Sequence, residues 1–154
     1  AEKAGLPVPR FLMEPGRSIV ADAGMTLYTV GSIKRIPGYK QYAAVDGGMT
    51  DNPRYALYQS RYTVYHGSKT GPTERFDVVG RCCESGDIIQ PHVELPADTC
   101  RGDILAVCTT GAYNYSMASN YNRLPRPPIV MLTPEGSYTA VRRETFADLT
   151  ALDE

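Results

Sequence analysis

Short stretches of β-forming residues, each ended within a few positions by Gly, Pro, Asp or Asn, recur through most of the chain. The sequence has 14 Gly, 12 Pro and 11 Tyr among its 154 residues, and no Trp. Gly and Pro favour turns, whereas tyrosine and β-branched residues favour strands. The pattern therefore argues against a helical bundle and indicates a mainly β fold of many short strands.

The strand pattern predicts a mainly antiparallel domain of about seven strands, a number typical of a β-sandwich or a Greek-key, barrel-like fold. Those strands are expected at residues 27–36, 42–45, 61–66, 76–82, 104–108, 129–132 and 138–142. The last two flank a turn at 133–136 and predict a hairpin. Short helices are expected near 51–58 and at 144–152.

The first residues differ in pattern from the rest. An apolar run at 11–13 precedes the turn 14–17, and residues 18–23 carry apolar side chains on one helical face before Gly24. This order predicts a strand–turn–helix unit. We therefore expect two structural units, residues 1–25 as a β/α unit and residues 26–154 as a β domain with a short C-terminal helix.

Net charge and hydropathy argue against two classes of binding partner, nucleic acids and membranes. Sixteen Lys and Arg against 17 Asp and Glu give a net charge of −1, which argues against a nucleic-acid-binding surface. No apolar run reaches the roughly 20 residues of a membrane-spanning helix, and the first residues do not resemble a signal peptide. The chain starts without Met. We expect part of a longer, cytoplasmic protein that binds neither nucleic acid nor membrane.

The four cysteines, at positions 82, 83, 100 and 108, form no C-x-x-C pair, and there are only two histidines. In a protein without a secretion signal this pattern predicts reduced thiols and no metal site.

Three segments are candidates for ligand binding. Glu14-Pro15-Gly16-Arg17 is either an anion site, with Gly16 allowing close approach and Arg17 adding charge, or a simple turn. Arg54 and Tyr58 are four residues apart on a predicted helix and would share a face that holds an anion, unless Arg54 is merely solvated. The polar run 111–122 either lines a pocket or forms a surface loop.

Cys83 and Glu84 lie side by side in a predicted turn. A neighbouring carboxylate disfavours the thiolate, so Cys83 is expected as S–H, an acid rather than a nucleophile. The alternative is a pair of small buried cysteines beside an exposed turn.

Taken together, the motifs resemble the C-terminal part of the diaminopimelate decarboxylase family, pyridoxal-phosphate (PLP) enzymes of the alanine-racemase/ornithine-decarboxylase fold group. The similar segments are EPGRSIVADAG (14–24), VDGGMTDNPRYALY (45–58), CESGD (83–87), GDILAV (102–107) and GAYNYSMASNYN (111–122). The closing RRETFADLTALDE is also similar. The resemblance spans nearly the whole chain in the expected order.

The resemblance implies a fold-type III PLP enzyme whose N-terminal (β/α)8 barrel, with the Schiff-base lysine, lies upstream of this chain. Residues 1–25 would be the last barrel unit. The family forms a homodimer with active sites shared between subunits. Catalysis by the fragment alone is not expected, because no lysine here matches a Schiff-base motif.

The resemblance also assigns roles to residues of this sequence. Cofactor contacts are implied for Glu14, Pro15, Gly16, Arg17 and Tyr113. Substrate contacts are implied for Arg17, Arg54, Tyr58, Glu84 and Tyr113. Cys83 would donate a proton in the other subunit's site, beside Glu84, which would recognise the distal end of the substrate.

The implied reaction is decarboxylation of meso-2,6-diaminopimelate to L-lysine and CO2, a step of lysine biosynthesis. Decarboxylases of the same fold that act on ornithine, arginine or carboxynorspermidine are the closest alternative. Glu84 after Cys83 and the run SMASNYN favour diaminopimelate. A racemase would need a second acid/base residue, which the sequence does not reveal. A standalone, non-catalytic β domain is the other alternative.

Overall fold

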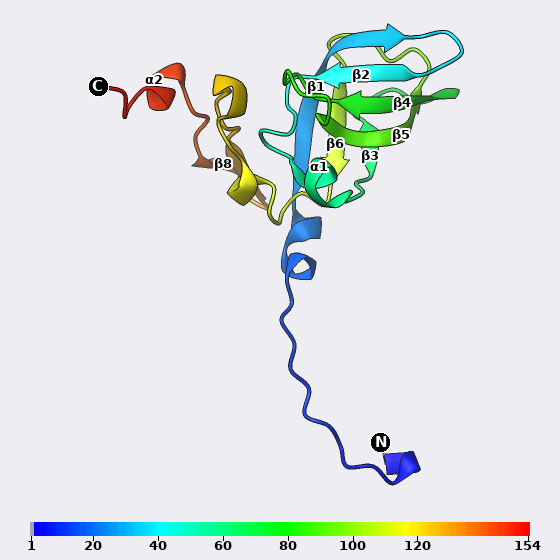
Figure 1. Cartoon of the computed structure of the whole chain (residues 1–154), viewed down its shortest axis with the longest axis vertical. Helices are drawn as coiled ribbons and strands as arrows, with labels where there is room; N and C mark the ends of the chain where they lie inside the picture. Colours follow the sequence, from blue (N-terminus) through cyan, green and yellow to red (C-terminus); the bar gives the residue numbers. More distant parts are fainter. Residues whose placement is uncertain (1) are drawn as a thin grey trace.

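A computed structural model of the chain describes residues 2–154 and has a mainly β fold, as predicted. Six strands form one sheet in the order β3-β6-β1-β2-β4-β5, and two more form a separate hairpin (Figure 1). The sheet strands are β1 (Met25–Arg35), β2 (Gln41–Val45), β3 (Val64–His66), β4 (Thr73–Val79), β5 (Ile88–Pro96) and β6 (Ile104–Cys108). The hairpin strands are β7 (Ile129–Thr133) and β8 (Gly136–Val141), and the helices are α1 (Arg54–Tyr58) and α2 (Phe146–Leu149).

Strand β1 joins the two halves of the sheet. Its first half pairs with β6 and its second half with β2, and the register shifts between Val30 and Ser32. Such a bulge bends a strand and increases its twist. The outermost strands, β3 and β5, come into contact, so the sheet is nearly closed and barrel-like. All its strand pairs are antiparallel except β2 with β4.

Apolar side chains that alternate along the strands fill the interior of this sheet. On β1, Tyr28 and Val30 are buried, whereas Met25 and Leu27 are each 62% exposed. Burying one such side chain contributes roughly 1.5–3 kcal/mol. The largest fully buried apolar residues are Val30, Phe76, Val78, Ile89, Leu95, Leu105 and Val107.

Strand β5 was not predicted from the sequence, and residues 2–154 therefore contain eight strands instead of about seven. Pro91 and Pro96 lie within it, and proline normally argues against a strand because it donates no backbone hydrogen bond. In the structure β5 is an edge strand paired on one side with β4. An edge strand tolerates proline, which reconciles the sequence with the fold.

The predicted strand at residues 11–13 and the predicted helix at 18–23 are wrong as single elements. Phe11, Leu12 and Met13 are 79%, 81% and 83% exposed on a segment that extends away from the sheet (Figure 1). A strand needs a neighbour for its N–H and C=O groups, and the described residues supply none. Two three-residue 3-10 turns replace the helix, η2 (Arg17–Ile19) and η3 (Ala21–Ala23). The division into units 1–25 and 26–154 stays a prediction.

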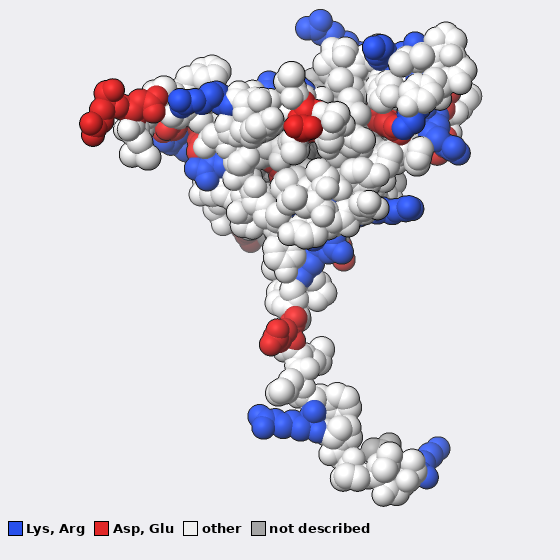
Figure 2. Space-filling view, viewed as in Figure 1, with Lys and Arg blue, Asp and Glu red and all other residues white. Residues whose placement is uncertain are grey.

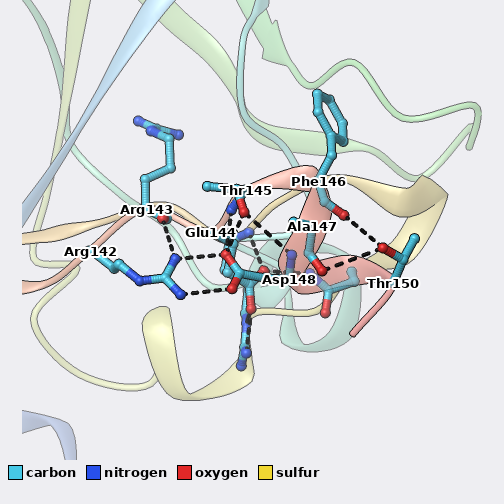
Figure 3. A network of polar contacts seen from close by, with 10 residues as sticks. Arg142, Arg143, Glu144, Thr145, Phe146, Ala147, Asp148 and Thr150 are labelled. Atoms are coloured by element: carbon cyan, nitrogen blue, oxygen red, sulfur yellow. Dashed lines mark hydrogen bonds and ion pairs between the residues drawn. The ribbon is translucent and has the colours of Figure 1, made fainter. Parts of the chain in front are cut away.

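The β7–β8 hairpin forms at the turn predicted from sequence, and α2 follows it to one side of the sheet (Figure 1). A polar network holds α2 (Figure 3). Thr145 and Asp148 cap each other at its start, and both oxygens of Asp148 accept from Arg142, at 2.6 and 2.7 Å. Helix α2 begins later than the predicted 144–152 because Thr145 is its N-cap, and it ends at Leu149.

The surface carries both signs of charge. On the face seen in Figure 2, Lys and Arg side chains are scattered among Asp and Glu, with broad uncharged areas between them. None of the helices described here has the length and apolar character needed to cross a lipid bilayer.

Candidate functional site

Arg54, at the start of α1, lies between two aromatic rings. Its guanidinium carbon is 5.0 Å from the ring centroid of Tyr58 and 4.8 Å from that of Tyr113. The four-residue spacing on α1 puts Tyr58 on the same face as Arg54. Each cation–π contact is worth about 0.5–2 kcal/mol. The two rings therefore hold the guanidinium in place before any ligand binds.

The Arg54 guanidinium has no acid partner within residues 2–154. One terminal nitrogen, Nη1, donates to the thioether sulfur of Met117 at 3.6 Å, and the buried Nε has no acceptor. A guanidinium has five N–H donors, and a buried donor left unpaired costs about 1–3 kcal/mol. The guanidinium of Arg54 thus has donors left that could bind an anionic, oxygen-bearing group.

Gly16 brings the turn at 14–17 against Tyr113. A β-carbon on Gly16 would lie 2.6 Å from the Tyr113 hydroxyl oxygen, so the phenol packs directly on the glycine. Tyr113 itself has a φ of 71°, which a bulky residue rarely adopts. Backbone strain of this kind is concentrated at functional sites. Tyr113 is therefore the residue that joins Gly16 to Arg54.

The turn at 14–17 offers backbone donors rather than a helix end. Only the short turn η2 follows it, so no helix dipole of the predicted size forms. The N–H groups of Arg17 and Ser18 donate no hydrogen bond within residues 2–154. Glu14, Pro15 and Arg17 are exposed. The anion site predicted from sequence would thus rest on free amides and on the charge of Arg17.

The glycine turn that leads into α1 is braced from inside the sheet. Asp51 accepts hydrogen bonds from the Tyr28 hydroxyl and, at 2.9 Å, from the Gly48 N–H. Burial raises the pKa of Asp51, and these hydrogen bonds oppose that shift. Burial and the negative charge of Asp51 raise the pKa of Tyr28 well above its usual value. This pair fixes the segment that carries Arg54.

Asp87 ties the glycine turn after β2 to the cysteine turn after β4. One carboxylate oxygen accepts the Met49 N–H at 2.6 Å and the other accepts the Cys82 N–H at 2.7 Å. The residue is only 4% exposed. Glycine at position 80 makes room for it, because a β-carbon there would lie 2.2 Å from the carboxylate. Two motifs distant in sequence therefore share one buried anchor.

The two adjacent cysteines have different environments. Cys82 is half-buried, and burial followed by the negative charge of Asp87 raises the pKa of its thiol to about 11. Cys83 is exposed, and its N–H donates to the Asn122 side-chain oxygen at 3.0 Å. All four cysteines are free thiols. Of the adjacent pair, Cys83 is the one accessible to a ligand.

Glu84 is exposed and accepts only local hydrogen bonds, from Ser85 at 3.3 Å and from the Gly86 N–H at 3.4 Å. Within residues 2–154, neither Cys83 nor Glu84 forms a hydrogen bond or ion pair with Arg54, Tyr58 or Tyr113. The predicted site residues therefore form two groups, one around Arg54 and Tyr113 and one at the Cys83–Glu84 turn.

Several residues that build these groups were not singled out from the sequence: Tyr28, Asp51, Asp87, Asn114, Met117 and Asn122. Their contacts join segments far apart in the chain, as in the buried Asn114, which accepts from the Tyr62 hydroxyl at 3.4 Å. In the sequence, the one signal that marked these residues was their position in polar motifs beside glycines. That signal marks a segment but not the role of one side chain.

The fold and these contacts define a nearly closed β domain in which Arg54 stacks on two tyrosine rings. A family model described as "Pyridoxal-dependent decarboxylase, C-terminal sheet domain" matches residues 18–111. The chain belongs to this family of C-terminal sheet domains.

Curated diaminopimelate decarboxylases are similar to nearly the whole chain. The diaminopimelate decarboxylase of Bacillus subtilis is 49% identical over 99% of this chain, and that of Synechocystis is 46% identical over 99%. The match covers 35% and 33% of those proteins, so the chain spans about a third of their length.

Solved structures agree with the fold. Diaminopimelate decarboxylase from M. jannaschii in complex with L-lysine has a TM-score of 0.87 and 37% identity, covering 99% of this chain and 35% of that one. A lysine/ornithine decarboxylase from Vibrio vulnificus, in complex with cadaverine, has a TM-score of 0.62 and 26% identity over 71% of this chain and 30% of that one.

Proposed function

We propose that this chain is the C-terminal part of a diaminopimelate decarboxylase, which converts meso-2,6-diaminopimelate to L-lysine and CO2 in lysine biosynthesis. The observation that carries the proposal is the Arg54 guanidinium, held between two tyrosine rings without an acid partner among residues 2–154. The name shared by the relatives supports the choice of substrate. Such a step belongs in the cytoplasm, which is our proposed location.

The charged groups of diaminopimelate match Arg54 on one side and the Cys83–Glu84 turn on the other. Diaminopimelate has an amino and a carboxyl group at each end, so an enzyme that decarboxylates one end must recognise the other. A carboxylate pairs well with the planar fork of Arg54, and Tyr58 lies beside it. The exposed carboxylate of Glu84 suits the distal ammonium group. Ornithine lacks the distal carboxylate and would leave Arg54 unpaired.

Pyridoxal phosphate would supply an electron sink for the carbon that loses CO2. The turn at 14–17 fits the phosphate of this cofactor, because it combines free amides of Arg17 and Ser18 with the Tyr113 hydroxyl packed against Gly16. Arg17 would add charge to the phosphate and also meet the substrate. Glu14 and Pro15 would shape the turn, and Tyr113 would contact both cofactor and substrate.

The Schiff-base lysine is not among these residues. Lys40 pairs with Asp77 and Lys69 pairs with Asp103, each at 2.7 Å. We place the reactive lysine in the part of the relatives' length that this chain does not span, in the N-terminal barrel. That barrel is therefore an obligatory partner of this domain.

Cys83 would donate the proton that replaces the lost CO2. It is the exposed member of the cysteine pair, and Cys82 is held protonated beside Asp87. Within residues 2–154 the Cys83–Glu84 turn forms no hydrogen bond or ion pair with Arg54, Tyr58 or Tyr113. We therefore propose that it completes the site of a second copy in a homodimer, where Cys83 protonates the substrate carbon.

The test is CO2 release by the complete protein that contains this segment, with PLP present. Meso-diaminopimelate is the substrate and L-ornithine the control. We expect release from diaminopimelate alone. Release from ornithine instead would overturn the substrate assignment and the pairing of Arg54 with a distal carboxylate, and no release from either amino acid would favour a non-catalytic domain.

A further inference from the structure

Two side chains accept hydrogen bonds from the consecutive backbone amides of Cys82 and Cys83. One is Asp87, at the far end of the same turn, and the other is Asn122, from a different loop. The Cys82 N–H donates to Asp87 at 2.7 Å, and the Cys83 N–H donates to the Asn122 Oδ1 at 3.0 Å. Asp87 is buried and also binds the Met49 N–H. Both amides lie on the N-terminal side of the Cys83 α-carbon, so two side chains fix the backbone that leads into Cys83. On its C-terminal side the Glu84 N–H donates to the Cys82 carbonyl at 2.8 Å, within the turn itself.

Asn122 is itself held in an unusual conformation. Its φ is 55°, in the left-handed region that asparagine tolerates better than most residues. The loop around it is anchored at two points. The Ser119 N–H donates to the Thr50 carbonyl at 2.8 Å, and the Asn120 side chain donates to Glu144 at 2.7 Å. Asn122 therefore offers its oxygen from a supported loop.

We propose that Asn122 is a positioning residue for the proton donor. Its oxygen orients the Cys83 amide, and Asp87 anchors the preceding amide, so the thiol is presented in one orientation. This inference rests on the proposed function, in which Cys83 protonates the substrate carbon. A general acid works only within hydrogen-bond reach of the atom it protonates, and small misplacements cost rate. Without Asn122 nothing else in residues 2–154 accepts the Cys83 N–H.

Three variants of the complete protein separate positioning from folding. Asn122→Gly removes the oxygen but keeps the left-handed backbone accessible. Asn122→Asp keeps an acceptor oxygen at the same place. Ser119→Ala removes the hydroxyl that accepts the Tyr121 N–H at 3.5 Å in the same loop, keeps the Ser119 N–H anchor and does not touch Cys83, so it is the matched control. Melting temperatures of all three show whether the fold survives.

The first measurement is amide hydrogen exchange at Cys83, which needs neither substrate nor cofactor. Loss of one hydrogen bond should speed exchange by about 5-fold or more in Asn122→Gly. Asn122→Asp and Ser119→Ala should exchange at the wild-type rate at this amide. Unchanged exchange in Asn122→Gly would overturn the inference, because the hydrogen bond would then not restrain Cys83.

The second measurement follows the proton itself. In Asn122→Gly we expect kcat to fall by about 5- to 10-fold with KM changed less than about 2-fold, and Asn122→Asp should restore most of the rate. In D2O the wild type should place deuterium on one face of the product carbon, and Asn122→Gly on both. A purely structural role for Asn122 predicts no change in this stereochemistry, and that result would overturn the inference.

Cys83→Ala, measured in parallel, distinguishes failure of the proposed proton donor from failure of the positioning role alone. If it leaves kcat unchanged, the proposed proton donor fails, and the positioning role fails with it. If Cys83→Ala loses activity while Asn122→Gly retains wild-type rate and stereochemistry, only the positioning role fails.

Discussion

The Tyr28 hydroxyl donates to the Asp51 carboxylate inside the barrel-like sheet, joining β1 to the glycine turn that leads into α1. Tyr28 is 3% exposed and Asp51 is 8% exposed. A buried carboxylate is costly unless hydrogen bonds compensate for its lost hydration. The buried Asp51 carboxylate therefore needs the Tyr28 hydroxyl as a donor, and this pair supports the segment that carries Arg54.

Replacing Tyr28 by Phe should destabilise the complete protein by about 1–3 kcal/mol, because Asp51 then loses a buried donor. Urea denaturation measures this loss. Folding also raises the pKa of Tyr28. The folded state thus holds this proton more tightly, and stability should fall as the pH rises above about 10. Tyr28→Phe should lack that part of the slope. Tyr39→Phe, at a residue 70% exposed, is the control, and an equal effect there would contradict the prediction.

Arg54→Ala should raise KM for diaminopimelate by about 10- to 100-fold, since a charged hydrogen-bonded pair contributes about 1.5–3 kcal/mol. Arg54→Lys should recover only part of this, because lysine lacks the planar fork that lies between the two tyrosines. Steady-state kinetics measure both. Arg75→Ala is the matched surface control and should leave KM unchanged, because the Arg75 side chain is 69% exposed and pairs with Glu94. A wild-type KM in Arg54→Ala would remove this residue from the substrate site.

The adjacent cysteines give a sharp comparison. Cys83→Ala should lower kcat by about 100-fold or more, the usual contribution of a general acid, with KM changed by less than about 3-fold. Cys82→Ala should keep kcat within about 3-fold, because its thiol is half-buried and held protonated beside Asp87. Rates at saturating substrate decide between them. Equal losses in both variants would show that the turn matters only as a structural element.

Gly16 and Tyr113 should be energetically coupled. Alanine at position 16 would place a β-carbon 2.6 Å from the Tyr113 hydroxyl oxygen, so the phenol must move. We expect Gly16→Ala to weaken PLP binding, and to weaken it less in a Tyr113→Phe background, by about 1 kcal/mol of coupling. Titration of the apoenzyme with PLP, followed by absorbance, gives the four affinities. Strictly additive effects would mean that the two residues act independently.

Local patterns in the sequence predicted much of the fold. Alternating apolar residues and strong turn signals placed seven of the eight sheet and hairpin strands and the hairpin turn at 133–136, because these signals act over a few residues. They failed for β5, where Pro91 and Pro96 obscured an edge strand. They also failed at residues 11–13, where an apolar run has no neighbouring strand in the described chain.

The site was less predictable than the fold. The pairing of Arg54 with Tyr58 follows from helical spacing, which is local. The contacts of Tyr113 with Gly16 and Arg54, and the anchoring of two turns by Asp87, depend on how the sheet closes. Spacing in one sequence contains no such information, so these partners emerge only from the three-dimensional arrangement.

Glu144 should make the C-terminal segment sensitive to acid. The Arg126 guanidinium donates to it at 2.7 Å, and this hydrogen bond with that of the Arg126 N–H lowers the pKa of Glu144 from 4.5 to about 2. A lowered folded pKa means that the stabilisation is present above pH 4.5 and is lost as the pH falls from there toward 2. Glu144→Gln should remove this part of the pH dependence.

An NMR titration of the Glu144 carboxyl carbon in the complete protein, together with hydrogen exchange at the Arg126 amide, measures the effect directly. The Arg126 N–H donates to the same carboxylate at 2.8 Å, so its protection should fall over the same pH range. Glu135→Gln, in the exposed β7–β8 turn, is the control and should leave that protection unchanged. If Glu144 titrated at its ordinary pKa, the pair with Arg126 would contribute nothing to holding α2 against the rest of the chain.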